Sequence, residues 1–326
     1  MIKMNTAHCA EHFQAAPWFI LGGGAMGCLW AYDLSPNSII LVKPERYRHY
    51  TSGSTKSLIT TQLAYQQTPF ASPNTRKCKL ANIQNYTSPI LKLIVTTKAQ
   101  DTVAALETIQ HTLHSHAHIL LLQNGMGSQQ AVKKQFPEYT LWCGSTTQGA
   151  YTTDFLHVVH AGLGQTCIGP WHISTETNPR YSAIFQQQLI TQGQQVIFID
   201  DILPLLWRKL AVNACVNGLT VLFECKNGEL LTHPKHLKWV KTLCQETAQF
   251  LDYKRIAYTK PLFQHVCHVL EQTAENYSST YMDVSHQRST ELMYINGFIL
   301  SEAKRLGLSL PTHTTLMAQL AEKGIF

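Results

Sequence analysis

A glycine-rich turn stands between two short apolar segments near the start of the chain. Residues 18–21 read Trp-Phe-Ile-Leu, residues 22–27 read Gly-Gly-Gly-Ala-Met-Gly, and a helix-like stretch and a second apolar segment follow. A strand, a glycine turn, a helix and a second strand within about 30 residues make the βαβ unit that binds dinucleotides. Gly22 suits the tight turn, Gly24 the approach of a pyrophosphate, and Gly27 close helix packing. The predicted cofactor contacts here are Gly22, Gly23, Gly24, Ala25, Met26 and Gly27.

The end of the second apolar segment distinguishes the two nicotinamide cofactors. An NAD-binding unit usually places Asp or Glu about 20 residues after the turn, where it accepts a hydrogen bond from the ribose 2′-hydroxyl. This chain has Lys43, followed by Pro44, Glu45 and Arg46. A cation suits a 2′-phosphate better than a pair of hydroxyls, so the sequence favours NADP(H) over NAD(H). The alternative is that Lys43 is only a solvated charge at a strand end.

Further apolar segments at 91–97 and 118–122 alternate with helical patterns, which is typical of a doubly wound sheet. Residues 53–87 alternate only weakly and carry turn residues, which indicates short strands or loops. After residue 200 the periodicity becomes helical, interrupted by Gly and Pro. The fold class predicted is α/β, a Rossmann-type doubly wound sheet followed by an all-helical domain. The predicted parts are an irregular extension at 1–17, an NADP-binding domain at 18–200 and a helical substrate and catalytic domain at 201–326.

Two polar residues follow the later apolar segments. Lys98 comes after LKLIVTT, and Asn124 comes after HILLLQ. Ligands of open α/β sheets bind outside the carboxyl ends of the strands. Lys98 would bring a donor to an anion there, and Asn124 would both donate and accept. The alternative for each is a turn or capping residue.

The first helical segment of the second half carries three polar residues on one stripe. Lys209, Asn213 and Asn217 follow one another at intervals of four in the otherwise apolar segment ILPLLWRKLAVNACVN. A buried amide without a partner costs about 1–3 kcal/mol, so these side chains need partners or a ligand. A sheltered lysine has a lowered pKa and becomes a usable proton donor. The alternative is that Lys209 extends to solvent and the amides bond to backbone.

Composition excludes several other classes of protein. The net charge of +6 is spread over the chain, and no basic patch interleaves with aromatic residues, which argues against nucleic acid as a partner. No stretch reaches the roughly 18 apolar residues of a membrane helix, and the first residues lack the apolar core of a secretory signal. The nine cysteines include no CxxC pair. We therefore expect a cytoplasmic protein with reduced thiols.

The segment HTLHSHAH is the one metal-like cluster. His111, His114, His116 and His118 run from a helix end into an apolar strand, where their side chains would diverge. No Cys or carboxylate completes a ligand set. No metal site is predicted.

The chain resembles the ketopantoate reductase (2-dehydropantoate 2-reductase) family over nearly its whole length from Trp18. The segments that carry the resemblance occur in the family's order: GGGAMG, VTTKAQD, LLQNGMG, GSTTQGA, LWRKLAVNACVNGLT, KNGEL, ENYSSTYMDV and TELMYINGFIL. LWRKLAVN and ENYSS are the most specific of them. The resemblance implies an oxidoreductase that reduces ketopantoate to pantoate with NADPH, in pantothenate and coenzyme A biosynthesis.

The resemblance also implies roles for individual residues. Lys209 would donate the proton to the C2 carbonyl oxygen, and Glu291 would order both Lys209 and the cofactor ribose. The implied substrate contacts are Asn124, Lys209, Asn213, Asn217, Asn227, Asn276 and Ser279. The implied cofactor contacts beyond the glycine turn are Lys43, Lys98, Asn124, Ala150 and Glu291.

Three features depart from the family pattern. Residues 1–17 match nothing in it. Gly218 stands where Pro is common, which predicts a looser helix end. Lys43 stands where Arg is frequent, so a planar two-point grip on a 2′-phosphate is lost and the preference for NADP is expected to be weaker.

Two alternative functions remain open from the sequence. One is a related reductase of another 2-keto or 3-hydroxy acid, because fold does not determine substrate. The other is a non-catalytic NADP(H)-sensing protein. Retention of Lys209, Asn213, Asn217, Ser279 and Glu291 argues against a sensor, which needs none of them. The sequence is compatible with a monomer or a homodimer.

Overall fold

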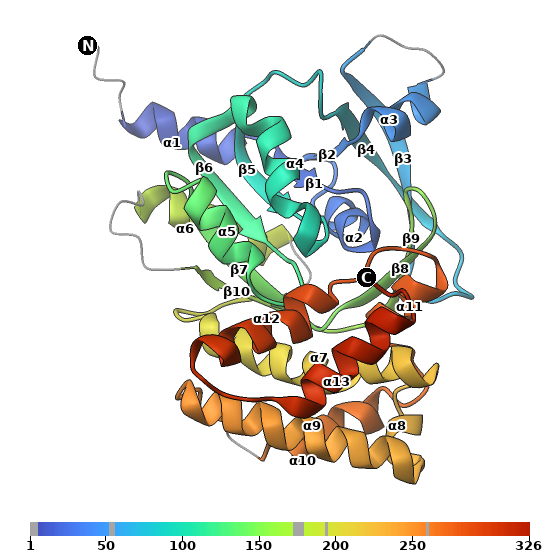
Figure 1. Ribbon diagram of the computed structural model, residues 1–326. Helices are drawn as coiled ribbons and strands as arrows, with labels where there is room; N and C mark the ends of the chain where they lie inside the picture. Colours follow the sequence, from blue (N-terminus) through green and yellow to red (C-terminus); the bar gives the residue numbers. More distant parts are fainter. Residues whose placement is uncertain (1–5, 52–55, 172–178, 193–194, 259–260) are drawn as a thin grey trace. The chain divides into compact units, whose positions relative to one another are not determined.

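The computed structural model describes residues 6–51, 56–171, 179–192, 195–258 and 261–326 (Figure 1). Internal contacts divide the chain into two compact units. The first, here the sheet unit, comprises Met1–Gln123 and Gln129–Ile202, and the second, here the helical unit, comprises Asn124–Ser128 and Leu203–Phe326. The short segment Asn124–Ser128, which lies between two parts of the sheet unit in sequence, therefore belongs by its contacts to the helical unit.

One mixed sheet forms the centre of the sheet unit in the described part of the chain. Its strands, in chain order, are β1 (Trp18–Leu21), β2 (Ser38–Val42), β3 (Leu58–Gln66), β4 (Asn74–Asn82), β5 (Ile90–Val95), β6 (Leu113–Leu121), β7 (Thr140–Thr146), β8 (Gly149–Asp154), β9 (His157–Gly162), β10 (Thr166–Pro170) and β11 (Val196–Phe198). Their spatial order is β11-β10-β7-β6-β5-β1-β2-β4-β3-β9-β8.

The middle of this sheet is parallel, and its flanks are mixed. Strands β7, β6, β5, β1, β2 and β4 run parallel to one another, and β1, β2 and β5 are buried along their whole length. Helices cover both faces of such strands, so their sequences read as continuous apolar runs. The predicted doubly wound sheet is confirmed. It is not wholly parallel, because β10 pairs antiparallel with β7, β3 with β4, and β8 with β9.

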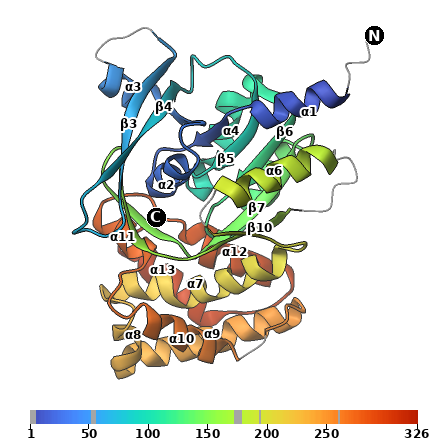
Figure 2. The same cartoon turned by 180° about the vertical axis from the view of Figure 1, so that it is seen from behind.

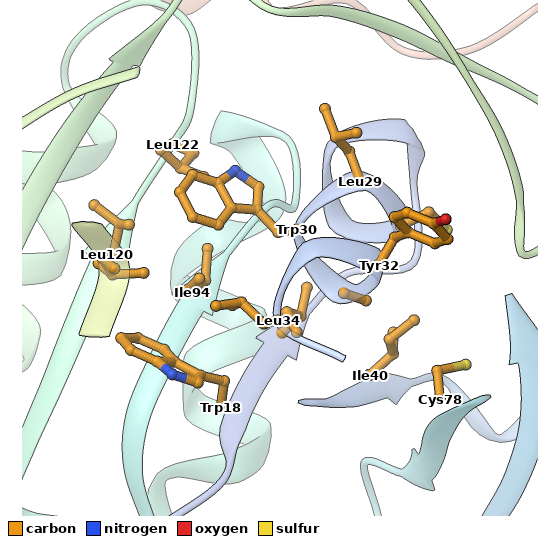
Figure 3. Packing of buried hydrophobic residues seen from close by; sticks show 14 of the residues in the cluster. Trp18, Leu29, Trp30, Tyr32, Leu34, Ile40, Cys78, Ile94, Leu120 and Leu122 are labelled. Atoms are coloured by element: carbon orange, nitrogen blue, oxygen red, sulfur yellow. The ribbon is translucent and has the colours of Figure 1, made fainter. Parts of the chain in front are cut away.

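The helices of the sheet unit are α1 (Thr6–Ala15), α2 (Ala25–Asp33), α3 (Pro44–Thr51), η1 (Ala99–Asp101), α4 (Thr102–Ile109), η2 (Gln110–Thr112), α5 (Ser128–Gln135) and α6 (Pro179–Gln192). Helices α1, α2 and α6 share one buried apolar cluster with the sheet, whereas α4 and α5 lie on the opposite face (Figures 1 and 2). Figure 3 shows Trp30 and Leu34 from the α2 region facing Trp18 and Ile94 of the sheet. This packing holds the glycine turn, since α2 begins directly after it.

The prediction of an irregular extension at the N-terminus is wrong for Thr6–Ala16. These residues form α1 and its end, and Ala10, Phe13 and Ala16 are buried in the apolar cluster. Phe13 stacks on Tyr181 of α6 with 4.8 Å between ring centroids. The three buried residues recur at intervals of three, which places them on one helical face. Residues 1–5 lie outside the described part of the chain.

A fully buried lysine, Lys92 in β5, helps to hold α1 in place. Its ammonium nitrogen donates to the side-chain oxygen of Gln188 at 2.7 Å and to the backbone oxygen of Gln14 at 3.3 Å. It also lies 5.1 Å from the ring centroid of Trp18. Burial lowers the pKa of Lys92 to about 7. The residue thus joins β5 to α1 and α6, a tertiary role that its position in an apolar strand did not reveal.

The helical unit contains α7 (Leu203–Phe223), α8 (Glu229–Thr232), α9 (Pro234–Tyr253), α10 (Leu262–Gln272), α11 (Ser279–Ser285), α12 (Leu292–Arg305) and α13 (Pro311–Glu322). Helix α7 is central, because α9, α10, α11, α12 and α13 all pack against it (Figure 1). It runs without a break through Gly218, where an added side chain would lie 2.9 Å from Leu316 of α13. The glycine therefore allows close packing of two helices, and the predicted loosening is wrong.

No helix in the described part of the chain has both the length and the apolar character to cross a membrane. The described residues also contain no group of three or more His, Cys, Asp and Glu side chains placed to hold a metal ion. His118 of the histidine-rich segment is buried and accepts a hydrogen bond from the indole of Trp142 at 3.1 Å.

Candidate functional site

The glycine turn joins β1 to α2 in a form that only glycine allows at two positions. Gly22 has φ of +117°, and a Cβ there would lie 2.9 Å from the hydroxyl of Thr96, which donates to the Gly22 carbonyl. A Cβ on Gly27 would overlap the Gly22 carbonyl oxygen. The start of α2 can therefore lie directly against the end of β1.

The face of the turn at Gly24 is open. Gly24 is the N-cap of α2, its backbone is extended, and an added Cβ would meet nothing within 4 Å. No side chain caps this helix end. The first backbone N–H groups of a helix lack intrahelical acceptors and attract anions, and open space beside them lets a phosphate approach. The neighbouring Ala25 and Met26 form the first turn of α2.

The remaining predicted cofactor residues of the sheet unit lie at strand ends or on a strand. Lys43 is exposed and connects β2 to α3, and its carbonyl accepts the first hydrogen bond of α3 from Tyr47 at 3.0 Å. Lys98 is half-buried after β5, and its carbonyl accepts from the Thr102 hydroxyl at 2.9 Å. Ala150 lies half-buried in β8. β5 and β2 flank β1, so Lys98 and Lys43 stand on either side of the glycine turn.

In the helical unit, the predicted proton donor lies beside a carboxylate. Lys209 is a half-buried residue of α7, and Glu291 is the half-buried N-cap residue of α12. Burial lowers the pKa of Lys209 to about 8, and the charge of Glu291 opposes this shift. Without its carboxylate neighbour, the lysine would lose its proton more readily. At neutral pH the side chain is therefore an ammonium whose proton is more easily released than that of an ordinary lysine.

A tight loop brings Asn124 to the same carboxylate. The Asn124 amide donates to Glu291 Oε2 at 3.1 Å, across 167 residues of sequence. The loop stays close to α12 because Met126 N–H donates to the Tyr294 carbonyl at 2.8 Å. Gly125 has φ of +77°, and a Cβ there would overlap that carbonyl oxygen. The glycine thus permits the contact that positions Asn124.

The predicted substrate residues of α7 share the face of Lys209. Asn213 is half-buried one turn after Lys209, and Asn217 is buried one turn further on. Because residues four apart on a helix are neighbours, Lys209, Asn213 and Asn217 form one polar stripe. The rest of α7 is largely apolar and buried, so this polar stripe is the part of the helix that is suited to bind a polar ligand.

Of the last three predicted substrate residues, Asn227 and Asn276 stand on two adjoining loops and Ser279 begins α11. Asn227 N–H donates to the Asn276 carbonyl at 3.0 Å, and the Asn227 side-chain amide donates to the Thr273 hydroxyl at 2.9 Å. Its side-chain oxygen is buried and has no hydrogen-bond partner within the described chain. Asn276 is exposed, as is Ser279 at the start of α11. The structure therefore brings Asn227 and Asn276 together.

A buried hydroxyl pair that the sequence analysis missed links α11 to α7. Thr220 donates to the Asn217 carbonyl at 2.9 Å and lies 2.7 Å from the Ser278 hydroxyl. Ser278 is the N-cap of α11 and accepts from Tyr281 N–H at 3.0 Å. The Ser278 proton therefore points to Thr220. This chain of hydrogen bonds anchors the helix that begins at Ser279, and only the fold reveals it.

Replacement of Thr220 by valine should loosen the start of α11. The change keeps the volume but removes the acceptor of the Ser278 hydroxyl, which is expected to lower the free energy of unfolding by about 1–3 kcal/mol. Amide exchange at Tyr281 should accelerate. Thr220→Ser, which keeps the hydroxyl, is the control and should protect that amide as the natural residue does. Equal exchange rates at Tyr281 in both variants would contradict the proposed link.

The family model described as ketopantoate reductase PanE/ApbA matches residues 18–172, and the model described as ketopantoate reductase PanE/ApbA C terminal matches residues 201–324. The 2-dehydropantoate 2-reductase of Bacillus subtilis (strain 168) is 31% identical over 293 residues, which cover 89% of this chain and 91% of that protein. The 2-dehydropantoate 2-reductase of Escherichia coli O157:H7 is 34% identical over 232 residues, covering 71% and 73%.

Among solved structures, a D-mandelate dehydrogenase in a ternary structure with NADH and anilino(oxo)acetate has a TM-score of 0.81 to this chain. The two sequences are 22% identical, and the match covers 94% of this chain and 98% of that one. At this identity the similarity shows the fold.

Proposed function

Because the chain belongs to the ketopantoate reductase family, we propose that it reduces the C2 ketone of 2-dehydropantoate to the alcohol of pantoate, with NADPH as the hydride donor. This reaction would serve pantothenate and coenzyme A biosynthesis. The observation that carries the proposal is Lys209, an ammonium with a pKa of about 8 beside Glu291 and on one stripe with two asparagines. Residues 18–200 would bind NADP(H), and residues 201–326 would carry substrate binding and catalysis.

The residues of the sheet unit fit a nicotinamide dinucleotide. The absent side chain at Gly24 leaves the space that a pyrophosphate needs, and the uncapped N-terminus of α2 offers N–H donors to it. Gly22, Gly23, Ala25, Met26 and Gly27 would complete this contact, with Lys98 and Ala150 nearby. When bound, the cofactor supplies the hydride. Lys43 and the other cations after β2 would meet the 2′-phosphate that distinguishes NADPH.

The polar stripe of the helical unit supports a small anionic substrate. Amide and hydroxyl groups bind a carboxylate and a hydroxyl without the desolvation that a full charge demands. Asn213, Asn217 and Asn227 would supply amides, and Ser279 a hydroxyl, with Asn276 nearby. The partnerless side-chain oxygen of Asn227 supports this role, because a buried acceptor without a partner in the protein suits a donor from a ligand.

The proton step is assigned to Lys209. Its ammonium would hydrogen-bond to the carbonyl oxygen at C2, stabilise the negative charge that develops there and then release a proton to it. Glu291 keeps Lys209 charged by opposing the effect of burial. Asn124 donates to Glu291, which directs the carboxylate. Asn124 would also contact both ligands, as the family resemblance implies.

Steady-state turnover tests the proposed function. NADPH absorbance should fall when ketopantoate is added and should stay constant without a keto acid. Parallel assays with NADH and with other 2-keto acids separate cofactor preference from substrate preference. Faster turnover of a different 2-keto acid would move the protein to a related reductase. Binding of NADPH without turnover of any keto acid would indicate a sensor.

Replacement of Glu291 by glutamine should impair the lysine and spare the fold. Glutamine can still accept the hydrogen bond from Asn124, but it no longer opposes the lowering of the Lys209 pKa. We expect kcat to fall about 10-fold or more. The loss of activity at alkaline pH should begin at lower pH than in the natural protein, and the substrate KM should rise. A change in melting temperature with an unaltered pH profile would show that Glu291 is only structural.

We also propose that the protein works in the cytoplasm on a small molecule, as a monomer or a homodimer, without nucleic acid or membrane as a partner. Light scattering at several protein concentrations would distinguish the two assembly states.

A further inference from the structure

Arg46 lies three residues after Lys43. Its guanidinium is planar and can form two parallel hydrogen bonds, whereas the ammonium of Lys43 is a point charge. Arg46 belongs to the first turn of α3, which is separated from the end of β2 by Lys43 alone. Its side chain is exposed, yet its guanidinium carbon lies 4.9 Å from the ring centroid of Phe155. A guanidinium over an aromatic face is favourable and restricts the side chain to few orientations. Arg46 is therefore an ordered surface cation.

Phe155 connects Arg46 to the glycine turn. It lies between β8 and β9, and a Cβ on Gly23 would lie 2.7 Å from Phe155 Cε2 and 3.4 Å from Val42 Cγ1. The ring thus packs where a side chain at Gly23 would be, next to the last residue of β2. Because Gly23 has no side chain, the ring of Phe155 can pack against the glycine turn, and the guanidinium of Arg46 lies over the same ring.

The backbone around Phe155 holds the ring in this place. Tyr50 of α3 donates its hydroxyl to the Phe155 carbonyl at 3.2 Å, and the two rings lie 4.9 Å apart. The Phe155 N–H donates to Asp154 Oδ1 at 2.6 Å. Two residues of α3, Arg46 and Tyr50, thus contact one aromatic residue of the β8–β9 turn. Because they lie four apart on the helix, they share the face that meets it.

The charge of Arg46 reaches the first turn of α2. Burial raises the pKa of the Cys28 thiol to about 12, and the Leu156 backbone and the Arg46 charge partly oppose this rise. Cys28 directly follows Gly27, so the guanidinium is within electrostatic range of the glycine turn. Glu45 precedes Arg46 in sequence and Asp154 precedes Phe155, but within the described residues Arg46 forms no ion pair with either carboxylate. Its charge remains available for an anion.

We propose that Arg46, whose guanidinium lies over the ring of Phe155, is the main residue that selects NADP(H) over NAD(H), by binding the ribose 2′-phosphate. The inference rests on the proposed cofactor role of the sheet unit. A cation–π contact of this kind occupies none of the guanidinium N–H groups with a carboxylate, so they can form a two-point hydrogen bond to phosphate. Lys43 would add a point charge. The guanidinium of Arg46 would thus form the two-point hydrogen bond to the 2′-phosphate that the ammonium of Lys43 cannot form.

Binding measurements test this proposal directly. The dissociation constants of NADP⁺, NAD⁺, 2′,5′-ADP and 5′-AMP would be measured by calorimetry for the natural protein and for Arg46→Gln. We expect NADP⁺ and 2′,5′-ADP to bind about 10–100-fold more weakly to the variant, and NAD⁺ and 5′-AMP to change by less than about 2-fold. Phe155→Leu should cause a smaller loss of the same kind, because it removes the stacking platform but leaves the charge.

Arg48→Gln is the matched control. Arg48 is also an exposed arginine of α3, but it lines a cavity of about 350 Å³ together with Lys56, Asn82 and Asn85. Its removal lowers the net charge equally and should leave the ratio of the NAD⁺ and NADP⁺ dissociation constants unchanged. Lys43→Gln should lower NADP⁺ affinity less than Arg46→Gln does.

The outcomes separate this inference from the proposed reaction. An unchanged ratio in Arg46→Gln, equal losses for NADP⁺ and NAD⁺, or a natural protein with no preference for NADP⁺ would each overturn the role of Arg46. If ketopantoate is not reduced but Arg46→Gln still loses 2′,5′-ADP selectively, the role of Arg46 stands and the proposed substrate is wrong.

Discussion

Replacement of Lys209 by alanine is expected to lower kcat for ketopantoate about 10²–10⁴-fold, the usual effect of removing a positioned general acid. NADPH should bind with nearly the affinity of the natural protein, because the glycine turn belongs to the sheet unit and Lys209 to the helical unit. Turnover followed by NADPH absorbance and binding followed by nucleotide fluorescence measure the two quantities independently. Undiminished turnover would exclude Lys209 as the proton donor.

Lys238→Ala is a suitable control for the loss of one lysine, since Lys238 is exposed on α9. Its removal should leave kcat within about 2-fold. A comparable loss of activity in both variants would point to an effect of net charge.

The lowered pKa of Lys209 leads to an expected dependence of activity on pH. Lys209 has a pKa of about 8, below the ordinary value of 10.5, so it is cationic below about pH 8 and becomes neutral above it. The cation is the form that donates. The profile of kcat/KM for ketopantoate reduction should therefore be level toward neutral pH and fall above about pH 8. Lys209→Arg, which stays charged, should lose this alkaline fall, and its persistence there would assign the ionisation to another group.

Replacement of Gly27 by alanine is expected to disturb both the stability of the sheet unit and its cofactor binding. The new methyl group would overlap the Gly22 carbonyl and lie 2.7 Å from the Thr96 hydroxyl. Because Gly27 is buried within α2, relief requires the helix to move away from β1. Overpacking of this kind costs about 1–3 kcal/mol, which corresponds to a fall of roughly 2–12 °C in Tm for a unit of this size. Calorimetry and NADP⁺ titration would measure the two effects.

Gly24→Ala separates steric strain from loss of the phosphate site. Gly24 has an ordinary negative φ and open space around its Cβ position, so the fold should accept alanine with little change in Tm. The methyl group would, however, occupy the space proposed for the pyrophosphate and weaken NADP⁺ binding. If Gly27→Ala melted at the temperature of Gly24→Ala, the close contact of α2 with β1 would not contribute to stability.

Much of the fold was predictable because its patterns are local. The apolar runs of β1, β2 and β5 are continuous since both faces of these strands are covered, and the spacing of Lys209, Asn213 and Asn217 follows from the pitch of a helix. Residues 53–87 gave only a weak pattern of short strands or loops. Residues 53–55 lie outside the described part of the chain; in the rest, β3 and β4 form an antiparallel pair toward the flank of the sheet, and the first half of β4 is largely exposed. The hydrophobic pattern of β8 is weak for the same reason, since its residues are only partly buried or exposed.

Long-range contacts were not predictable in this way. The Asn124 amide reaches Glu291 over 167 residues, and Thr220 meets Ser278 over 58. No pattern in the sequence indicates a role for Phe155, because a single aromatic residue in a turn has no periodic neighbours that would identify its partner. Its role depends on the missing side chain of Gly23 in another element.

Local sequence patterns therefore predicted the central strands, the glycine turn and the polar stripe of α7, because backbone geometry repeats over a few residues and side-chain spacing records it. The folded structure was needed to show that α1 is part of the core, that Asn124 and Glu291 are partners, and that Arg46 lies over Phe155, whose ring packs against Gly23. These contacts arise when elements distant in sequence bury their surfaces together, and no local spacing encodes which distant side chain fills the space that a glycine leaves.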